Sequence, residues 1–213
     1  GLGEGSYVGI GDARTHNFVG GSTTQERNVV GFIAIEGAGT EFNWVMGNYV
    51  GVTADGRKPL GHPALSHGAG VLIWQYAGNN VVQQNVVSGN DRCGVTLWNG
   101  AGSNLLRANR IGVAADGVSP LPNGETDIAV NGPENRIGGF RPGDGNTIAF
   151  SLEGVVVYEH PGNTIRGNSI YGHPGPGIEL RGGNAGLAAP VITTVTPNSV
   201  CGTACPGCTV DVY

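Results

Sequence analysis

The chain has 213 residues, of which 40 are glycine and 13% are charged, and its formal net charge at pH 7 is −5. This acidic balance argues against a nucleic-acid partner, which would need a basic surface. No apolar run reaches membrane-spanning length and no helical hydrophobic period is present. The composition therefore predicts an all-β chain rich in bends, with almost no helix and no membrane span.

The first 16 residues already have the character of a solenoid, with a predicted strand at Tyr7–Ile10. No amphipathic helix precedes this strand. Natural β-helices usually cover their first turn, because an open turn exposes unpaired backbone groups and apolar side chains. We therefore expect either that an upstream part has been removed or that another molecule supplies the cover.

From residue 17 onward one unit recurs: asparagine, any residue, a branched aliphatic residue, two linker residues, and the same three residues again. Four copies are uninterrupted, at Asn43/Val45 with Asn48/Val50, Asn80/Val82 with Asn85/Val87, Asn104/Leu106 with Asn109/Ile111, and Asn163/Ile165 with Asn168/Ile170. Two copies carry an insertion, at Asn17/Val19 with Asn28/Val30 and Asn135/Ile137 with Asn146/Ile148. Short third strands accompany the doublets at Val71–Trp74, Gly94–Trp98, Ile128–Val130, Val155–Tyr158 and Ile178–Leu180. Without insertions the period is roughly 22–24 residues, as in solenoids.

This spacing predicts a parallel β-helix, in which three short strands and three tight bends make one turn. Asparagine suits the bends because it tolerates left-handed backbone angles and can form side-chain ladders between turns. The aliphatic residue two positions later points inward and stacks on its counterpart about 4.8 Å away. A β-sandwich, the alternative, has no need of six doublets in one register.

Three runs carry a family resemblance: N-V-V-S-G-N at 85–90, G-N-Y-V-G-V-T-A-D-G at 47–56 and N-R-I-G-V-A-A-D-G at 109–117. They resemble the repeats of secreted bacterial right-handed parallel β-helix proteins of the pectate-lyase-like architecture. The resemblance covers about residues 5–185. It implies a right-handed solenoid of about seven turns over residues 1–185 and an extracellular or cell-surface location. It does not fix an activity, because this architecture serves lyases, hydrolases, adhesins and structural rods.

Two related insertions, Gly51–His62 and Gly112–Asn123, leave the coil after the second asparagine of a doublet, so both should project from one face. Their aspartates, Asp55 and Asp116, raise the question of a calcium site. We favour a turn, in which aspartate caps the bend and the following glycine takes a positive φ. No metal or other cofactor is predicted.

Alternation along the third strands sends Trp74, Trp98 and Tyr158 to the outer surface. Aromatic ring faces suit a carbohydrate ligand and a protein contact equally well. They can also simply shield the strands beneath them. These three residues are the candidate ligand-binding residues.

Glycan-cleaving enzymes need clustered carboxylates and a placed base. The chain has no Asp-Asp pair and no Arg-x-Pro-x-x-Arg run. Carboxylates on neighbouring strands could still converge, for example Glu153 or Glu179 with Asp127. The remaining candidates are histidines beside proline or glycine, which we expect in exposed turns: His62, His67, His160 and His173. No catalytic residue is predicted.

Residues 186–213 are predicted to form a tail with a strand at Pro190–Val195 and a hairpin at Ser199–Tyr213 around Ala-Cys-Pro-Gly. The last strand of the tail has no obvious partner and is free to fold back or to add to a sheet in another subunit. The disulfide candidates are Cys93, Cys201, Cys205 and Cys208. Cys205 with Cys208, Cys201 with Cys208, and Cys93 with the tail of its own or a neighbouring chain all stay open. Zinc is disfavoured because no histidine or acid lies within the cluster.

The sequence favours a non-catalytic extracellular structural protein that self-associates head to tail, or by strand donation, into a filament or stalk. One alternative is a carbohydrate-binding or lyase-like module. Another is a passenger fragment of a larger bacterial adhesin. No signal peptide is visible, so a secreted protein would be represented by its mature form or a fragment.

Overall fold

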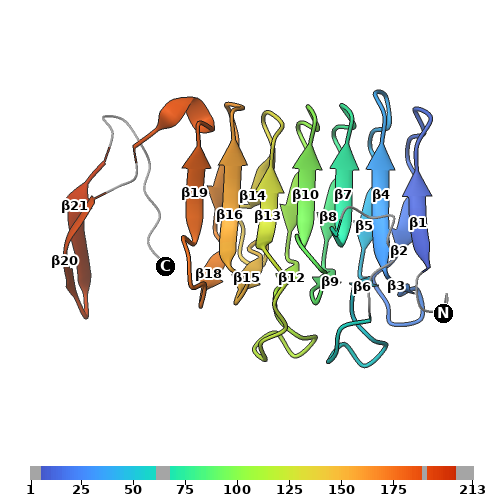
Figure 1. Cartoon of the computed structure of the whole chain (residues 1–213), viewed down its shortest axis with the longest axis horizontal. Helices are drawn as coiled ribbons and strands as arrows, with labels where there is room; N and C mark the ends of the chain where they lie inside the picture. Colours follow the sequence, from blue (N-terminus) through green and yellow to red (C-terminus); the bar gives the residue numbers. More distant parts are fainter. Residues whose placement is uncertain (1–5, 61–67, 189–190, 205–213) are drawn as a thin grey trace.

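A computed structural model describes residues 6–60, 68–188 and 191–204, and the chain coils through successive turns that lie side by side (Figure 1). Each turn contributes one strand to each of three parallel sheets. Sheet A contains seven strands: β1 (Tyr7–Ile10), β4 (Phe32–Glu36), β7 (Val71–Trp74), β10 (Val95–Trp98), β13 (Thr126–Val130), β16 (Glu153–Tyr158) and β19 (Ile178–Arg181). This arrangement confirms the predicted parallel β-helix of about seven turns.

The other two sheets hold the asparagine doublets and have six strands each. Sheet B contains β2 (Phe18–Gly20), β5 (Trp44–Met46), β8 (Val81–Gln83), β11 (Leu105–Arg107), β14 (Arg136–Gly138) and β17 (Thr164–Arg166). Sheet C contains β3 (Val29–Val30), β6 (Tyr49–Val50), β9 (Val86–Val87), β12 (Arg110–Ile111), β15 (Thr147–Ala149) and β18 (Ser169–Tyr171). In each doublet the first aliphatic residue therefore lies in sheet B and the second in sheet C.

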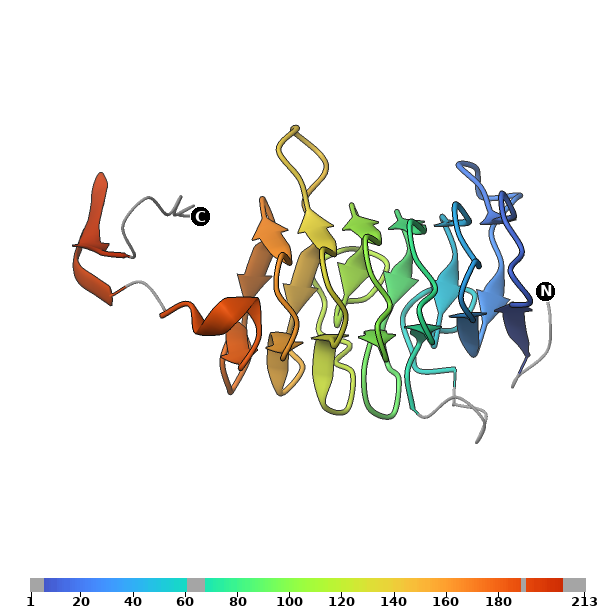
Figure 2. The ribbon, with the colours of Figure 1, turned by 90° about the horizontal axis from the view of Figure 1, so that it is seen from above.

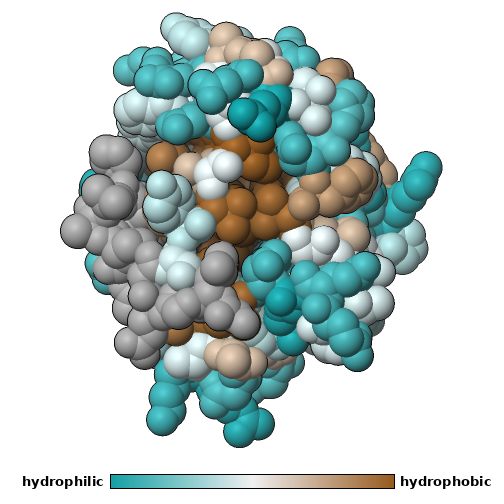
Figure 3. Space-filling model, turned by 90° about the vertical axis from the view of Figure 1, so that its right-hand side faces the viewer, coloured by the Kyte–Doolittle hydropathy of each residue, from teal (hydrophilic) through white to brown (hydrophobic). Residues whose placement is uncertain are grey.

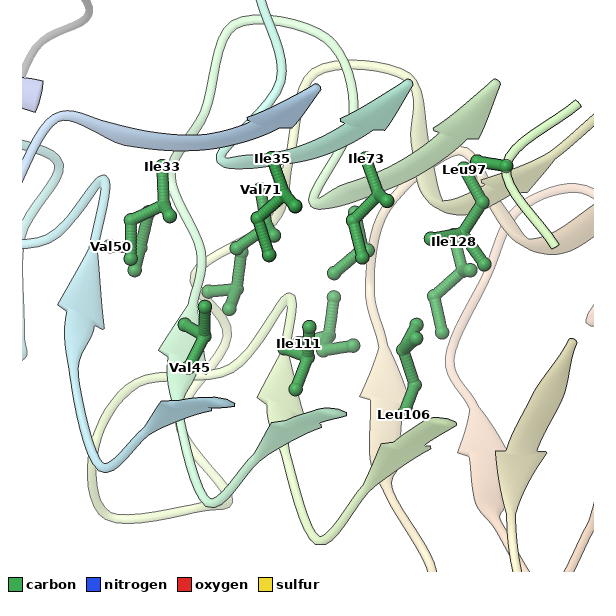
Figure 4. Close-up of a cluster of buried hydrophobic side chains, with 14 of the residues drawn as sticks. Ile33, Ile35, Val45, Val50, Val71, Ile73, Leu97, Leu106, Ile111 and Ile128 are labelled. Carbon is green, nitrogen blue, oxygen red and sulfur yellow. The ribbon is translucent and has the colours of Figure 1, made fainter. Parts of the chain in front are cut away.

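The core consists of columns of aliphatic side chains that point into the coil from all three sheets (Figure 4). On sheet A, for example, Ile73, Leu97 and Val130 are register partners and all three are fully buried. The expected inward position Ile178 is an exception at 49% exposed. Its strand, β19, is the last of sheet A and has no further strand stacked on it.

Two ladders of asparagine side chains run along the bends that flank sheet B. In each step the backbone N–H of one asparagine donates to Oδ1 of the asparagine in the next turn. In every step before Asn163 the Nδ2 group donates to the same oxygen, as from Asn80 to Asn104, where the two bonds are 3.0 and 3.2 Å. The first ladder comprises Asn17, Asn43, Asn80, Asn104, Asn135, Asn163 and Asn184, and the second Asn28, Asn48, Asn85, Asn109, Asn146 and Asn168. The bonds satisfy buried amides that would otherwise destabilise the fold. The asparagine-to-asparagine bonds always run toward the C-terminal neighbour, so both ladders have a direction. Nδ2 also donates back to a backbone carbonyl of the preceding turn, as from Asn80 to Thr40 at 3.1 Å.

The asparagine doublets of the sequence end at Asn168/Ile170, but the structure adds Asn184 to the first ladder. This asparagine begins a short 3-10 helix, Asn184–Gly186, and accepts a bond of 2.9 Å from the backbone N–H of Asn163. The aliphatic residue that follows the other ladder asparagines is absent here, which is why the pattern did not reveal it.

The two projecting insertions lie against each other: the backbone N–H of Ala115 donates to the carbonyl of Gly56 at 2.9 Å. A small second core of Val52, Val86, Ala114 and Leu121 joins them to sheet C. Each aspartate is bonded within its own loop. Asp116 accepts from the Ser119 hydroxyl at 2.6 Å, and this bond is the main reason its pKa is lowered to about 2. The predicted turns are therefore present.

The C-terminal hairpin consists of β20 (Val191–Thr196) and β21 (Ser199–Thr203), with its turn at Pro197 and Asn198. A strand was predicted at Pro190–Val195, and β20 confirms it over residues 191–195. Its partner β21 is the first part of the hairpin predicted at Ser199–Tyr213. Proline followed by asparagine is itself a strong turn signal. Of that expected hairpin, residues 205–213 lie outside the described part. Every residue of β20 and β21 is exposed, and the hairpin lies beyond β19, apart from the turns of the coil (Figure 2).

Candidate functional site

A groove of ≈ 320 Å³ runs across the outer face of sheet A. Its floor consists of Leu72, Thr96 and Ala129, which are register partners on three successive strands, β7, β10 and β13. One wall is aromatic and stands at the ends of the strands. The other wall is polar, stands at their beginnings, and includes Arg92, Cys93, Glu125 and Thr126.

The aromatic wall contains all three residues singled out from the sequence. Trp74 and Trp98 are register partners on β7 and β10. Tyr158 lies on β16, two strands beyond Trp98, and its ring packs edge-on against Trp98 with centroids 5.2 Å apart. The structure therefore brings these residues together, and their role in ligand binding stays a prediction.

Ion pairs hold the charged groups in and beside the groove. Arg92 Nε lies 3.0 Å from Glu125 Oε1, and this bond raises the pKa of the Arg92 guanidinium. Arg181 donates to the Tyr158 hydroxyl at 2.9 Å and pairs with both Glu153 and Glu179. The bond to Glu179 is the main reason the pKa of Arg181 is raised.

Asp127 does not meet Glu153 or Glu179, so the candidate convergence of either glutamate with Asp127 is not found. The Asp127 side chain is fully buried and accepts bonds from Ser151 Oγ at 2.5 Å and Asn123 Nδ2 at 2.8 Å. His173 Nε2 lies 2.9 Å from its second oxygen. Burial raises the pKa of Asp127, and the three bonds oppose that rise.

His173 was expected in an exposed turn, and that expectation is also wrong, because its side chain is only 2% exposed. At the position of Asp127 the neighbouring strands carry glycine, Gly94 and Gly154. Because these glycines have no side chain, the Asp127 carboxylate has room inside the coil. The sequence signal for this buried aspartate was that it replaces glycine at a position where the neighbouring turns carry glycine. His160 is half-buried, while His62 and His67 lie outside the described residues.

Ser151, His173 and Asp127 are the residue types of a hydrolytic triad, but their order is different. In a triad the histidine lies between the serine and the acid and removes the serine proton. Here Asp127 lies between the other two and uses one oxygen for each. The cluster is buried, and it links three successive turns of the coil.

The cysteines within the described ranges are free thiols. Cys93 lies in the groove wall, where burial raises its pKa, and Cys201 is exposed on β21. A pairing of Cys93 with the tail, one of the open alternatives, is therefore not found for Cys201. Cys205 and Cys208 lie outside the described part.

Among the described residues no three potential ligands gather at a metal site. The helical content of the same residues includes no segment with the length and apolar character of a membrane span.

The N-terminal end of the coil is a second candidate site. Its strands β1, β2 and β3 each pair with a described strand on one side only. Apolar side chains are visible at the centre of this end, inside a polar rim (Figure 3). A hollow of ≈ 440 Å³ there is lined in part by Ile10, Phe18 and Val19.

The ladders begin at the same end. Every later asparagine accepts hydrogen bonds through Oδ1, but the Oδ1 atoms of Asn17 and Asn28 accept none from a described residue. Phe18, beside Asn17, is 68% exposed. The end thus combines apolar surface with unused acceptors.

Comparison with known proteins adds no further constraint. No protein-family model matches the chain, and no curated protein or solved structure matches it either.

Proposed function

We propose that this chain is a non-catalytic extracellular structural protein whose β-helix extends end to end, with the C-terminal side of one copy stacking on the N-terminal end of the next. The observation that carries the proposal is the N-terminal end of the coil. Among the described residues, three strand edges without a partner, an apolar centre and two asparagine acceptors without a donor lie together there. Unpaired strand edges are templates for further pairing.

The direction of the ladders supports a head-to-tail contact. Within the ladders, asparagine N–H and Nδ2 groups donate to Oδ1 of the asparagine in the C-terminal neighbour, and no ladder Oδ1 accepts from the C-terminal side among the described residues. A turn that docks on Asn17 and Asn28 must therefore present its own C-terminal side, because two N-terminal ends would oppose acceptor to acceptor. A head-to-tail contact that does not close into a ring gives a filament.

The acidic residues support a non-catalytic role. Glu153 and Glu179 are both paired with Arg181, and Asp127 is buried with three partners. A general acid or base must reach the substrate proton directly or through one water. None of these three carboxylates is free to do so.

The extracellular location rests on the likeness of the repeats to those of secreted bacterial β-helix proteins. In that setting a stalk or an adhesin shaft is the natural role for a rod of stacked turns. The tail cysteines Cys205 and Cys208 would be able to form a disulfide there.

Sedimentation velocity and electron microscopy over a range of protein concentrations test the proposal. We expect elongated oligomers that grow with concentration. Val8→Lys places a charge at the apolar N-terminal end, where Val8 is partly buried, and should leave the protein monomeric. Val118→Lys, on a projecting loop at 69% exposure, is the matched control and should associate like the unmodified chain.

A monomer at every concentration would overturn the end-to-end contact, and would favour a module whose N-terminal end receives a further turn of a longer chain. If Val8→Lys and Val118→Lys changed the association equally, the end-to-end contact would also be overturned, because the contact would not lie specifically at the N-terminal end.

A further inference from the structure

We propose that the groove on sheet A binds a neutral carbohydrate chain, and that it discriminates against acidic sugars. This goes beyond the structural role and does not depend on it, because the floor of the groove lies on β7, β10 and β13, in the middle of sheet A and not at either end of the coil.

The groove has the shape of a binding site for a short chain. Its volume of ≈ 320 Å³ lies at the lower end of the range for small-ligand sites, roughly 300–1,000 Å³. The low floor of Leu72, Thr96 and Ala129 spans three turns. On β16, the next strand, the register partner of Ala129 is Val156. On β19 the register partner of Val156 is Glu179, which pairs with Arg181. The groove therefore has a defined length along the rod.

The aromatic wall offers apolar ring surface to one side of the ligand. A sugar ring has a face of C–H groups that packs well on an aromatic ring, while its hydroxyls point outward around the edge. Trp98 and Tyr158 meet edge to face, so they form a fixed corner. Aromatic side chains of this kind add contact area at a low cost in conformational entropy.

The polar wall offers both donors and acceptors. Arg92 and the Thr96 hydroxyl can donate, and Glu125 can accept. The Thr126 hydroxyl donates its hydrogen to Glu153 at 3.1 Å, so toward a ligand it can only accept. Sugar hydroxyls both donate and accept, so a mixed set suits them better than a cluster of one kind.

The charges of the groove decide which carbohydrate fits. The groove lining holds one ion pair, Arg92 with Glu125. Beside the groove Arg181 pairs with both Glu153 and Glu179, so two arginines stand against three glutamates in and beside the site. A uronate carboxylate would have to displace one of these glutamates and would meet an excess of negative charge. A neutral chain meets neither obstacle.

Titration calorimetry and tryptophan fluorescence test the proposal, at a concentration where sedimentation shows one species. The neutral probes are cello-, xylo-, manno- and chito-oligosaccharides, and the acidic probes are galacturonate and mannuronate oligomers without calcium. We expect saturable binding of at least one neutral chain and none of the acidic chains.

Two variants assign the binding to the groove. Trp98→Ala should weaken it by about tenfold or more, as for aromatic anchors in other interfaces. Thr96→Trp fills the floor and should abolish it without altering the aromatic wall. Phe140→Ala, an aromatic residue at 63% exposure beside Arg166 near sheet B, is the matched control and should leave binding unchanged. Circular dichroism establishes that each variant keeps the β fold.

Absence of binding by every neutral probe would overturn the proposal. Preference for the acidic chains would overturn the charge argument. Binding that survives both Trp98→Ala and Thr96→Trp in folded protein would place the site elsewhere. None of these results bears on end-to-end association, which sedimentation measures separately.

Discussion

The β-helix and the C-terminal hairpin are built from similar strands but differ in how the strands are covered. β13 has a partner strand on both sides and all five of its residues are buried, whereas β20 has one partner and all six of its residues are exposed. Both segments are rich in threonine and β-branched aliphatic residues. Strand propensity is therefore the same kind of signal in both, and the stacking of turns makes the difference.

The comparison shows where the stability of this protein resides. In the coil, each turn buries the aliphatic residues of the turn before it and satisfies its asparagines. A two-stranded hairpin by itself is marginally stable. Substitutions in the coil should consequently cost far more than similar ones in the hairpin.

The largest difference is expected at the ladder. Asn109→Ala removes the acceptor for the N–H and Nδ2 groups of Asn85 and the donor to Val82, so we expect a loss of about 3–5 kcal/mol in unfolding free energy. Asn198→Ala in the exposed hairpin turn should change it by less than about 0.5 kcal/mol. Urea unfolding measures both. Similar losses would mean that the ladder bonds add little.

The core should show the next largest difference. Leu106 is fully buried, and Leu106→Ala should lower the unfolding free energy by about 3 kcal/mol, through lost burial and the cavity left behind. Val195→Ala, at 69% exposure on β20, should have almost no effect. Thermal unfolding of both variants checks this, and a large effect of Val195→Ala would show that the hairpin packs against something.

Asp127 should have an intermediate effect, because two contributions oppose each other. Asp127→Ala leaves Asn123, Ser151 and His173 without their acceptor but also removes a buried carboxylate. We expect a net loss of about 2 kcal/mol by urea unfolding. A gain in stability would instead show that the desolvation of the carboxylate outweighs its three bonds.

The smallest effect is expected in the projecting loop. The pKa of Asp116 is lowered from 3.8 to about 2, chiefly by its bond to Ser119, so its ionised form stabilises the folded state. This contribution is present above pH 3.8 and is lost as the pH falls through about 2. The Asp116→Ala variant should therefore melt at a slightly lower temperature than the unmodified chain at neutral pH. The two melting temperatures should become equal as the pH approaches 2. If the difference in melting temperature between the two proteins stayed constant from neutral pH to about pH 2, the lowered pKa of Asp116 would be contradicted.

The sequence by itself determined the repeating architecture. The asparagine doublets and the aliphatic residue two positions later recur often enough to specify the parallel coil, its inward columns and the outward Trp74, Trp98 and Tyr158. These features are local and periodic, so a pattern along the chain records them.

Tertiary structure alone decided the rest. Asn184 joins the ladder only because its backbone reaches the right place, and Asp127 meets His173 only because three turns stack. The ion pairs of Arg181 and the groove floor likewise join residues from different turns. Such contacts depend on the register between turns and on side-chain direction, and neither has a period that can be found in a single sequence.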